Sequence, residues 1–180
     1  MTHANEFPRP ISIESLPEGG AAFEITATPE ERRALAGRLD LIALESLTAR
    51  GRVKRVRPGG LIRLTGVLEA SVVQTCVVTL EPLAGTLREP MERLYTDRPE
   101  AAAVVGEVTV DPEGEEIEWL SGGALDLGEV VAEDLALALD PYPRLPDAEA
   151  QVAERLGPGV SLNAPEARER PFAALHHRAS

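Results

Sequence analysis

Residues 61–82, LIRLTGVLEASVVQTCVVTLEP, form the longest stretch of the chain that is rich in strand-forming residues. Val, Ile, Leu and Thr recur throughout it, and these residues favour an extended backbone. Pro82 closes the stretch, because proline cannot donate a hydrogen bond within a sheet. The sequence therefore predicts a long strand over residues 61–82 that contains Cys76, the only cysteine of the chain, and ends at Pro82.

The segments on both sides of this strand predict partners for it. Residues 49–57 are expected to be extended and to form a hairpin with residues 61–69 through the Pro-Gly-Gly turn at 58–60. Residues 83–95 contain Pro90, which disfavours a helix and favours another strand. Shorter strands are predicted at residues 11–13, 21–27 and 40–47.

Two segments predict helices. Thr28 is placed to cap a short helix that starts at Pro29 and ends near Gly37, with Glu31 completing a capping box. Residues 125–140, LDLGEVVAEDLALALD, predict an amphipathic helix with Asp126 as its cap and Glu129 returning the capping bond. Its apolar stripe comprises Leu127, Val130, Val131, Leu135, Ala138 and Leu139.

Together these elements predict an α+β fold. We expect an antiparallel, β-rich sheet or partly open barrel, with one short N-terminal helix and the amphipathic helix near 125–140 packed on it. The length of 180 residues suits one globular domain, assigned to residues 1–146. Residues 147–180 predict a largely disordered tail with a short docking segment near residues 171–175.

Charge is unevenly distributed along the chain, whose formal net charge is −12. Residues 99–143 contain twelve acidic residues and no lysine or arginine. A basic segment precedes the long strand, and Arg50, Arg52 and Lys54 in it would share one face of an extended chain. The basic segment could form a contact surface for phosphates or for an acidic partner. Alternatively, it is a solvated edge strand whose charges prevent aggregation. Its cations are Arg50, Arg52, Lys54, Arg55 and Arg57.

Several function classes find no support in the sequence. It has no Gly-rich phosphate loop, nucleophile motif or metal-ligand spacing, so we expect no enzymatic activity, no metal and no cofactor. One cysteine excludes an internal disulfide. Without a signal peptide or a long apolar run, a soluble, cytoplasmic protein with no membrane partner is expected. Trp119, the only tryptophan, is expected to be a core or interface anchor.

Three stretches form an ordered pattern. The first joins Gly66-Val67-Leu68 to residues 76–82, Cys-Val-Val-Thr-Leu-Glu-Pro; the second is the Asp-Leu-Gly-Glu of residues 126–129 with its proline-rich exit; the third is residues 170–175, Arg-Pro-Phe-Ala-Ala-Leu. In order and spacing they resemble the YceD family, known as large ribosomal RNA subunit accumulation proteins. The residues that carry the two main motifs are Cys76, Leu80, Glu81, Pro82, Asp126, Leu127, Gly128 and Glu129.

The chain departs from the family pattern at its cysteines. Thr79 stands where many members have a second cysteine, and the further cysteines of those relatives, which suggest zinc, have no counterpart here. A cysteine-built zinc site is therefore excluded. Cys76 is expected to be a small buried hydrophobe, with a reactive thiol as the alternative.

The resemblance implies a non-enzymatic ribosome-biogenesis factor that supports the synthesis, processing or stability of 23S ribosomal RNA. In one hypothesis the basic segment contacts 23S rRNA or a large-subunit precursor. In the other the chain is an acidic adaptor that binds a basic ribosomal protein or an RNA-processing enzyme through Glu129, Glu133 and Asp134, without touching RNA. An aromatic content of 3% argues against sequence-specific stacking on single-stranded bases.

Overall fold

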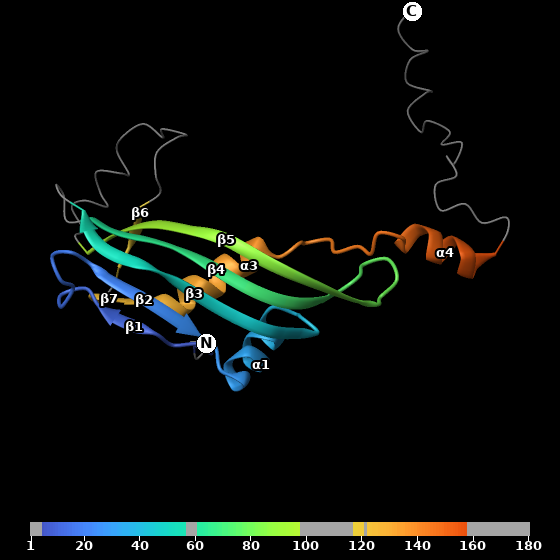
Figure 1. Ribbon diagram of the computed structural model, residues 1–180, viewed down its shortest axis with the longest axis horizontal. Coiled ribbons are helices and arrows are strands. Elements are labelled where there is room, and N and C mark those ends of the chain that lie inside the picture. Colours follow the sequence, from blue (N-terminus) through green and yellow to red (C-terminus); the bar gives the residue numbers. More distant parts are fainter. Residues whose placement is uncertain (1–4, 57–60, 98–116, 121, 158–180) are drawn as a thin grey trace, which may run out of the picture.

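The computed structural model describes residues 5–56, 61–97, 117–120 and 122–157 (Figure 1). Over these residues the chain has the predicted α+β fold, built on an open sheet with the strand order β2-β3-β4-β5-β6. Neighbouring strands are antiparallel except β5 and β6, which run parallel. The strands are β2 (Ala21–Thr26), β3 (Ala43–Val56), β4 (Leu61–Thr75), β5 (Pro82–Thr96) and β6 (Ile117–Trp119).

Strand β4, at the centre of the sheet, pairs over nearly its whole length with β3 on one side and β5 on the other. The antiparallel pairing predicted between residues 49–57 and 61–69 is confirmed up to Val56, whereas Arg57 and the predicted turn at residues 58–60 lie outside the described residues. The prediction that the long strand continues to Pro82 is wrong, because β4 ends at Thr75 and Pro82 is the first residue of β5. The strand predicted at residues 40–47 is not separate, because it continues into β3 through a register shift between Leu44 and Ser46. Pro90 is tolerated in β5 because only β4 pairs with that part of the strand among the described residues.

Helix α1 (Pro29–Arg38) begins where the sequence predicts it. The Thr28 hydroxyl accepts a hydrogen bond from the Glu31 N–H, and the Glu31 carboxylate accepts one from the Thr28 N–H. The predicted capping box is therefore present.

Helix α3 (Leu127–Ala138) starts directly after Asp126, whose carboxylate accepts a hydrogen bond from the Gly128 N–H. The predicted cap is confirmed, but the returning bond from Glu129 is not formed. Its carboxylate instead pairs with Arg38 at the end of α1, 2.6 Å away. The two helices are thus joined by an ion pair that local sequence could not indicate.

The core lies on one face of the five-stranded sheet, which we call the inner face. Helix α3 packs on β4 and β5 from this side, and it buries Leu127, Val131 and Leu135 of the predicted stripe. A small sheet of β1 (Pro10–Ser12) and β7 (Ala124–Asp126) completes the inner layer. Figure 1 shows α3 running beneath the long strands on this side. The opposite side of the sheet is called the outer face.

The segment after α3 contains a further helix, α4 (Ala148–Leu156), within the tail for which the sequence predicts much disorder. In Figure 1, α4 lies beyond the tip of the β4–β5 hairpin. The docking segment predicted near residues 171–175 falls outside the described residues. Among the described helices, none is long and apolar enough to cross a membrane.

Candidate functional site

Three cations of the basic segment project from the outer face of β3. Arg50, Arg52 and Lys54 are exposed, whereas Ala49 and Val53 are buried on the inner side. Alternate residues of a strand point to opposite faces. The prediction that these three cations share one face is therefore confirmed.

Strand pairing brings more charges onto the same face, because residues paired across a sheet point to the same side. Lys54 pairs with Arg63, and Thr48 pairs with Glu69, which in turn pairs with Arg88. Sequence reasoning missed Arg63 and Arg88; the alternation of β4 and β5 was the signal that could have found them. In the rows from Thr48 to Lys54 the outer-face charges are Arg50, Arg52, Lys54, Arg63, Arg88, Glu24, Glu69 and Glu92. This area is positive although the chain is acidic.

These cations differ in how far carboxylates neutralise them. Glu69 pairs with Arg88 at 2.6 Å and with Arg50 at 3.8 Å. Arg52, in contrast, donates to the Gly19 carbonyl at 2.9 Å. Among the described residues, no carboxylate lies within ion-pairing distance of Arg52 or Lys54. Their charges are therefore available to an outside partner.

An open hollow of about 690 Å³ lies beside these cations, lined by Arg50 and Arg52. Its floor is the backbone of Gly51 and Gly66, which pair directly across β3 and β4. A β-carbon on Gly66 would lie 2.7 Å from the Arg50 carbonyl oxygen, and one on Gly51 would overlap the carbonyl oxygen of Thr65. Glycine is therefore required at both positions, and it lets the strands approach closely.

The other two cations of the predicted group do not join this surface. Arg55 lies on the inner face, where it pairs with Asp97 at 3.4 Å and donates to the Ile13 carbonyl. Its expected role beside Arg50, Arg52 and Lys54 does not fit this position. Arg57 lies outside the described residues.

The acidic residues proposed for an adaptor surface on α3 are engaged within the molecule. Besides the Glu129–Arg38 pair, Asp134 and Glu133 lie 2.5 Å and 3.1 Å from Arg93 of β5. Burial opposes the charge of Arg93, but its hydrogen bonds to Asp134 and Glu118 raise its pKa above the ordinary value. These carboxylates thus hold α3 on the sheet.

Cys76 is fully buried, as the sequence predicts, but it lies in the turn that follows β4 rather than within the strand. Its sulfur lies 3.5 Å from the Thr79 nitrogen and 3.4 Å from the Leu145 nitrogen, and both N–H groups point to it. Burial raises the pKa of the Cys76 thiol, but hydrogen bonds from the Thr79 side chain and nearby N–H groups outweigh it and lower the pKa to about 7. The sulfur thus ties the turn to the chain leaving α3.

The described residues contain no group of three or more His, Cys, Asp or Glu side chains that could hold a metal ion. Around Cys76, the place of a second cysteine is taken by Thr79, which is itself buried. Cys76 therefore acts through hydrogen bonds in the described part of the chain.

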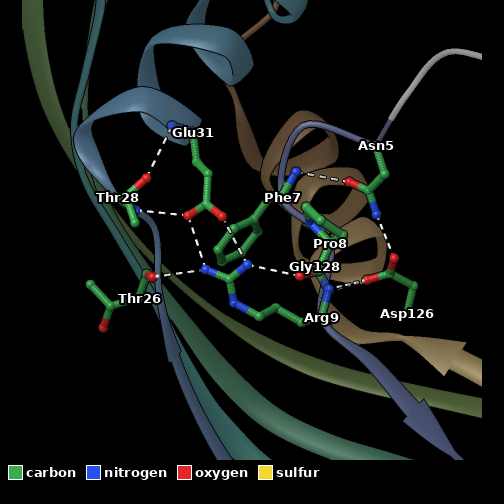
Figure 2. Close-up of polar contacts among 9 residues, drawn as sticks. All are labelled: Asn5, Phe7, Pro8, Arg9, Thr26, Thr28, Glu31, Asp126 and Gly128. Carbon is green, nitrogen blue, oxygen red and sulfur yellow. Dashed lines mark hydrogen bonds and ion pairs between the residues drawn. The ribbon is translucent and has the colours of Figure 1, made fainter.

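The Asp-Leu-Gly-Glu segment anchors the N-terminal strand, as Figure 2 shows. The Asp126 carboxylate accepts hydrogen bonds from the Arg9 N–H at 2.8 Å and from the side-chain amide of Asn5. The Arg9 guanidinium in turn binds both carboxylate oxygens of Glu31 at 2.8 Å and 2.9 Å. Because Glu31 also caps α1, this chain of contacts links the N-termini of α1 and α3.

The two main motifs meet in space. The Val77 N–H, in the turn after β4, donates to the carbonyl of Pro143 in the proline-rich exit of α3 at 2.9 Å. Helix α3 itself packs on β4 and β5. Segments about 65 residues apart in sequence therefore build one unit.

A family model described as large ribosomal RNA subunit accumulation protein YceD matches residues 64–177. The match covers more than half of the 180 residues. The chain belongs to the YceD family. The resemblance found in the sequence motifs is thereby confirmed, and the family name links the chain to large-subunit ribosomal RNA. The comparison with curated proteins gives no match, and neither does the comparison with solved structures.

The YceD match includes most of β4, all of β5 and α3, and the segment that follows α4. It begins after β3, so the cations Arg50, Arg52 and Lys54 lie outside it. The matched region therefore supplies β4 and β5, next to which β3 pairs, whereas β3 and its cations belong to the N-terminal part of the chain.

Proposed function

We propose that this YceD protein is a non-enzymatic ribosome-biogenesis factor that contacts 23S ribosomal RNA, or a large-subunit precursor, through the outer face of its sheet. The contact supports the synthesis, processing or stability of that RNA. The observation that carries the proposal is the exposed pair Arg52 and Lys54, whose charges no described carboxylate neutralises. Cations without carboxylate partners can neutralise phosphates and release their counterions.

The distribution of charge supports the same surface. The acidic helix α3 faces the opposite side of the sheet, and its carboxylates pair with Arg38 and Arg93. The negative charge nearest the sheet is therefore partly balanced within the molecule, away from the cations of β3. A chain with a formal charge of −12 can approach RNA by this face while the acidic remainder points away.

The same ion pairs weaken the adaptor hypothesis. A basic protein that bound Glu129, Glu133 and Asp134 would compete with Arg38 and Arg93 for the same oxygens. Each ion pair that is broken would leave Arg38 or Arg93 without its carboxylate partner. Binding at this surface would therefore loosen the attachment of α3.

The test measures the affinity of the full chain for fragments of 23S rRNA at two salt concentrations. The variant Arg50→Gln, Arg52→Gln, Lys54→Gln should bind roughly tenfold or more weakly, and its salt slope should fall by about 0.7–0.9 for each phosphate that is no longer neutralised. The matched control, Arg33→Gln, Arg144→Gln, Arg155→Gln, removes the same charge from exposed positions elsewhere and should bind nearly as the wild type does. Equal weakening in both variants, or no salt-sensitive binding by the wild type, would contradict the proposal.

A cellular experiment tests the role in rRNA accumulation. Depletion of the protein should lower the ratio of large- to small-subunit rRNA, and the control variant should restore it while the β3 variant does not. If variants neutralised at Glu129, Glu133 and Asp134 fold normally yet lose a protein partner, while the β3 variant supports normal rRNA, the adaptor hypothesis holds instead.

A further inference from the structure

Trp119 occupies a position that its expected role as a core anchor does not explain. It lies on β6, where it pairs with Thr96 of β5, and 47% of its surface is exposed. The core part of the prediction is therefore wrong. Because its neighbour Glu118 reaches Arg93 on the inner face, Trp119 points to the outer face.

The strand register places Trp119 next to the cations of this face. One row across the sheet joins Lys54, Arg63, Leu94 and Ile117, and the next row ends in Thr96 and Trp119. With strands about 4.8 Å apart and about 3.3 Å per residue, the α-carbons of Lys54 and Trp119, which are three strands apart, are about 16 Å apart. A few nucleotides of an extended strand can span this distance.

Trp119 is also separate from the other exposed large apolar side chains of the described residues. Val77 and Leu80 lie in the turn between β4 and β5, at the opposite end of β5 from β6, and Tyr142 lies close to that turn because the Val77 N–H donates to the Pro143 carbonyl. Ile42, Leu137 and Leu156 lie toward the same end: the Ile42 N–H donates to the Val73 carbonyl, Ala136 and Leu139 line a hollow with Leu80, and Arg155 pairs with Glu81. A protein-binding patch gathers several large apolar residues around its centre. An isolated tryptophan beside cations is instead the arrangement of single-stranded nucleic acid sites, which combine a positive track with aromatic stacking platforms.

We propose that Trp119 stacks on an unpaired base of the RNA whose phosphates lie along Arg52 and Lys54. This inference rests on the proposed RNA contact. It specifies the kind of RNA that is bound: a segment with at least one single-stranded nucleotide. One aromatic side chain gives a stacking platform without reading the base, since every base has a π-face. The low aromatic content of the chain therefore limits sequence specificity and not stacking itself.

The experiment uses a labelled single-stranded RNA oligonucleotide from 23S rRNA, the same oligonucleotide with one abasic nucleotide at each position in turn, and its fully paired duplex. Binding is followed by the anisotropy of the RNA label and, separately, by the emission of Trp119, the only tryptophan. Stacking predicts that the emission changes on binding of the single strand, that one abasic position removes this change, and that the duplex produces little of it.

Two substitutions separate stacking from charge. Trp119→Ala should weaken single-strand binding about 5- to 100-fold while the salt slope stays the same, because the cations still neutralise the same phosphates. Trp119→Phe should retain most of the affinity. Circular dichroism and Tm establish whether each variant is folded. If Trp119→Ala does not fold, the emission experiment on the wild type still tests stacking.

The outcomes distinguish this inference from the proposed function. Salt-dependent binding by the wild type with unchanged tryptophan emission, or full affinity in folded Trp119→Ala, overturns base stacking and leaves the phosphate contact intact. No binding of any RNA by the wild type overturns both. A loss of binding in Arg52→Gln, Lys54→Gln together with an emission change in the wild type supports both.

Discussion

Gly128 of α3 lies directly against the backbone of Phe7, so closely that a β-carbon on Gly128 would overlap the Phe7 carbonyl oxygen. The contact brings the N-terminal segment onto the first turn of α3, where Asp126 also binds the Arg9 N–H. Glycine in this family motif thus serves packing: a larger residue would have to push the backbone of residues 5–9 away. Gly128 is buried, as is its neighbour Leu127.

Gly128→Ala should therefore destabilise the protein, by about 1–3 kcal/mol, because the backbone of Phe7 must shift to make room. The matched control is Gly37→Ala in α1, where a β-carbon meets nothing within 4 Å. That change should be neutral or stabilising by up to about 1 kcal/mol, since alanine favours helices over glycine. Urea denaturation measures both, and equal effects of the two substitutions would contradict the packing argument.

The Arg9–Glu31 ion pair predicts a pH dependence of stability. Hydrogen bonding to Arg9 lowers the pKa of Glu31 below its ordinary value of 4.5, against the opposing effect of burial. Because the pKa is lower in the folded state, the ionised carboxylate stabilises the fold above about pH 4.5, and this contribution is lost as the pH falls through the folded-state pKa.

Glu31→Gln should thus lower the free energy of unfolding near neutral pH, and the wild-type and variant curves should converge at acidic pH. Glu30→Gln is the control, because Glu30 pairs with Arg33 in an exposed position and should change stability by less than about 0.5 kcal/mol. A constant difference between wild type and Glu31→Gln across the acidic range would show that ionisation of Glu31 does not contribute to stability.

Helix α3 provides a matched test of packing on the inner face. Leu135 is completely buried, whereas Leu137, two residues later, is 81% exposed. Leu135→Asp places a charge in the core and should cost more than about 4 kcal/mol, enough to unfold or loosen the domain. Leu137→Asp should melt nearly as the wild type does. A normal melting temperature for Leu135→Asp would refute the packing of α3 on the sheet.

The sequence predicted those parts of the fold that local patterns control. Strands β4 and β5 follow from β-branched residues and prolines, and α3 follows from an apolar stripe and the cap at Asp126. Alternation along β3 was enough to place Arg50, Arg52 and Lys54 on one face. Features that depend on the spacing of apolar residues or on helix capping are determined by neighbouring residues, and for these features the prediction holds.

Features that join distant segments could not be predicted in this way. Asp126 binds the Arg9 N–H across 117 residues, and Glu129 pairs with Arg38 of α1 rather than closing its own cap. Trp119 turned to the outer face because strand pairing rather than composition decides which side a residue of β6 takes. Arg55, in contrast, lies on the inner face by the same alternation along β3 that places Arg52 and Lys54 on the outer one, so grouping it with them by charge alone was wrong. The candidate site was thus predicted in its β3 part and missed where β4, β5 and β6 contribute to it.

Cys76 gives the last prediction, which concerns alkaline rather than acidic pH. Its thiol has an ordinary pKa of 9.0, which burial would raise, but hydrogen bonds from the Thr79 side chain and from nearby N–H groups lower it to about 7. The folded-state pKa is therefore below that of the unfolded state. The thiolate contributes stability that is fully present above about pH 9 and is lost as the pH falls through about 7.

Relative to Cys76→Ala, the wild type should gain stability between pH 7 and 9, as measured by urea denaturation. Thr79→Val should reduce this gain by removing a hydroxyl donor, whereas Thr75→Val, at an exposed position, should preserve it. Parallel pH profiles of the wild type and Cys76→Ala would show that the sulfur is a neutral packing group.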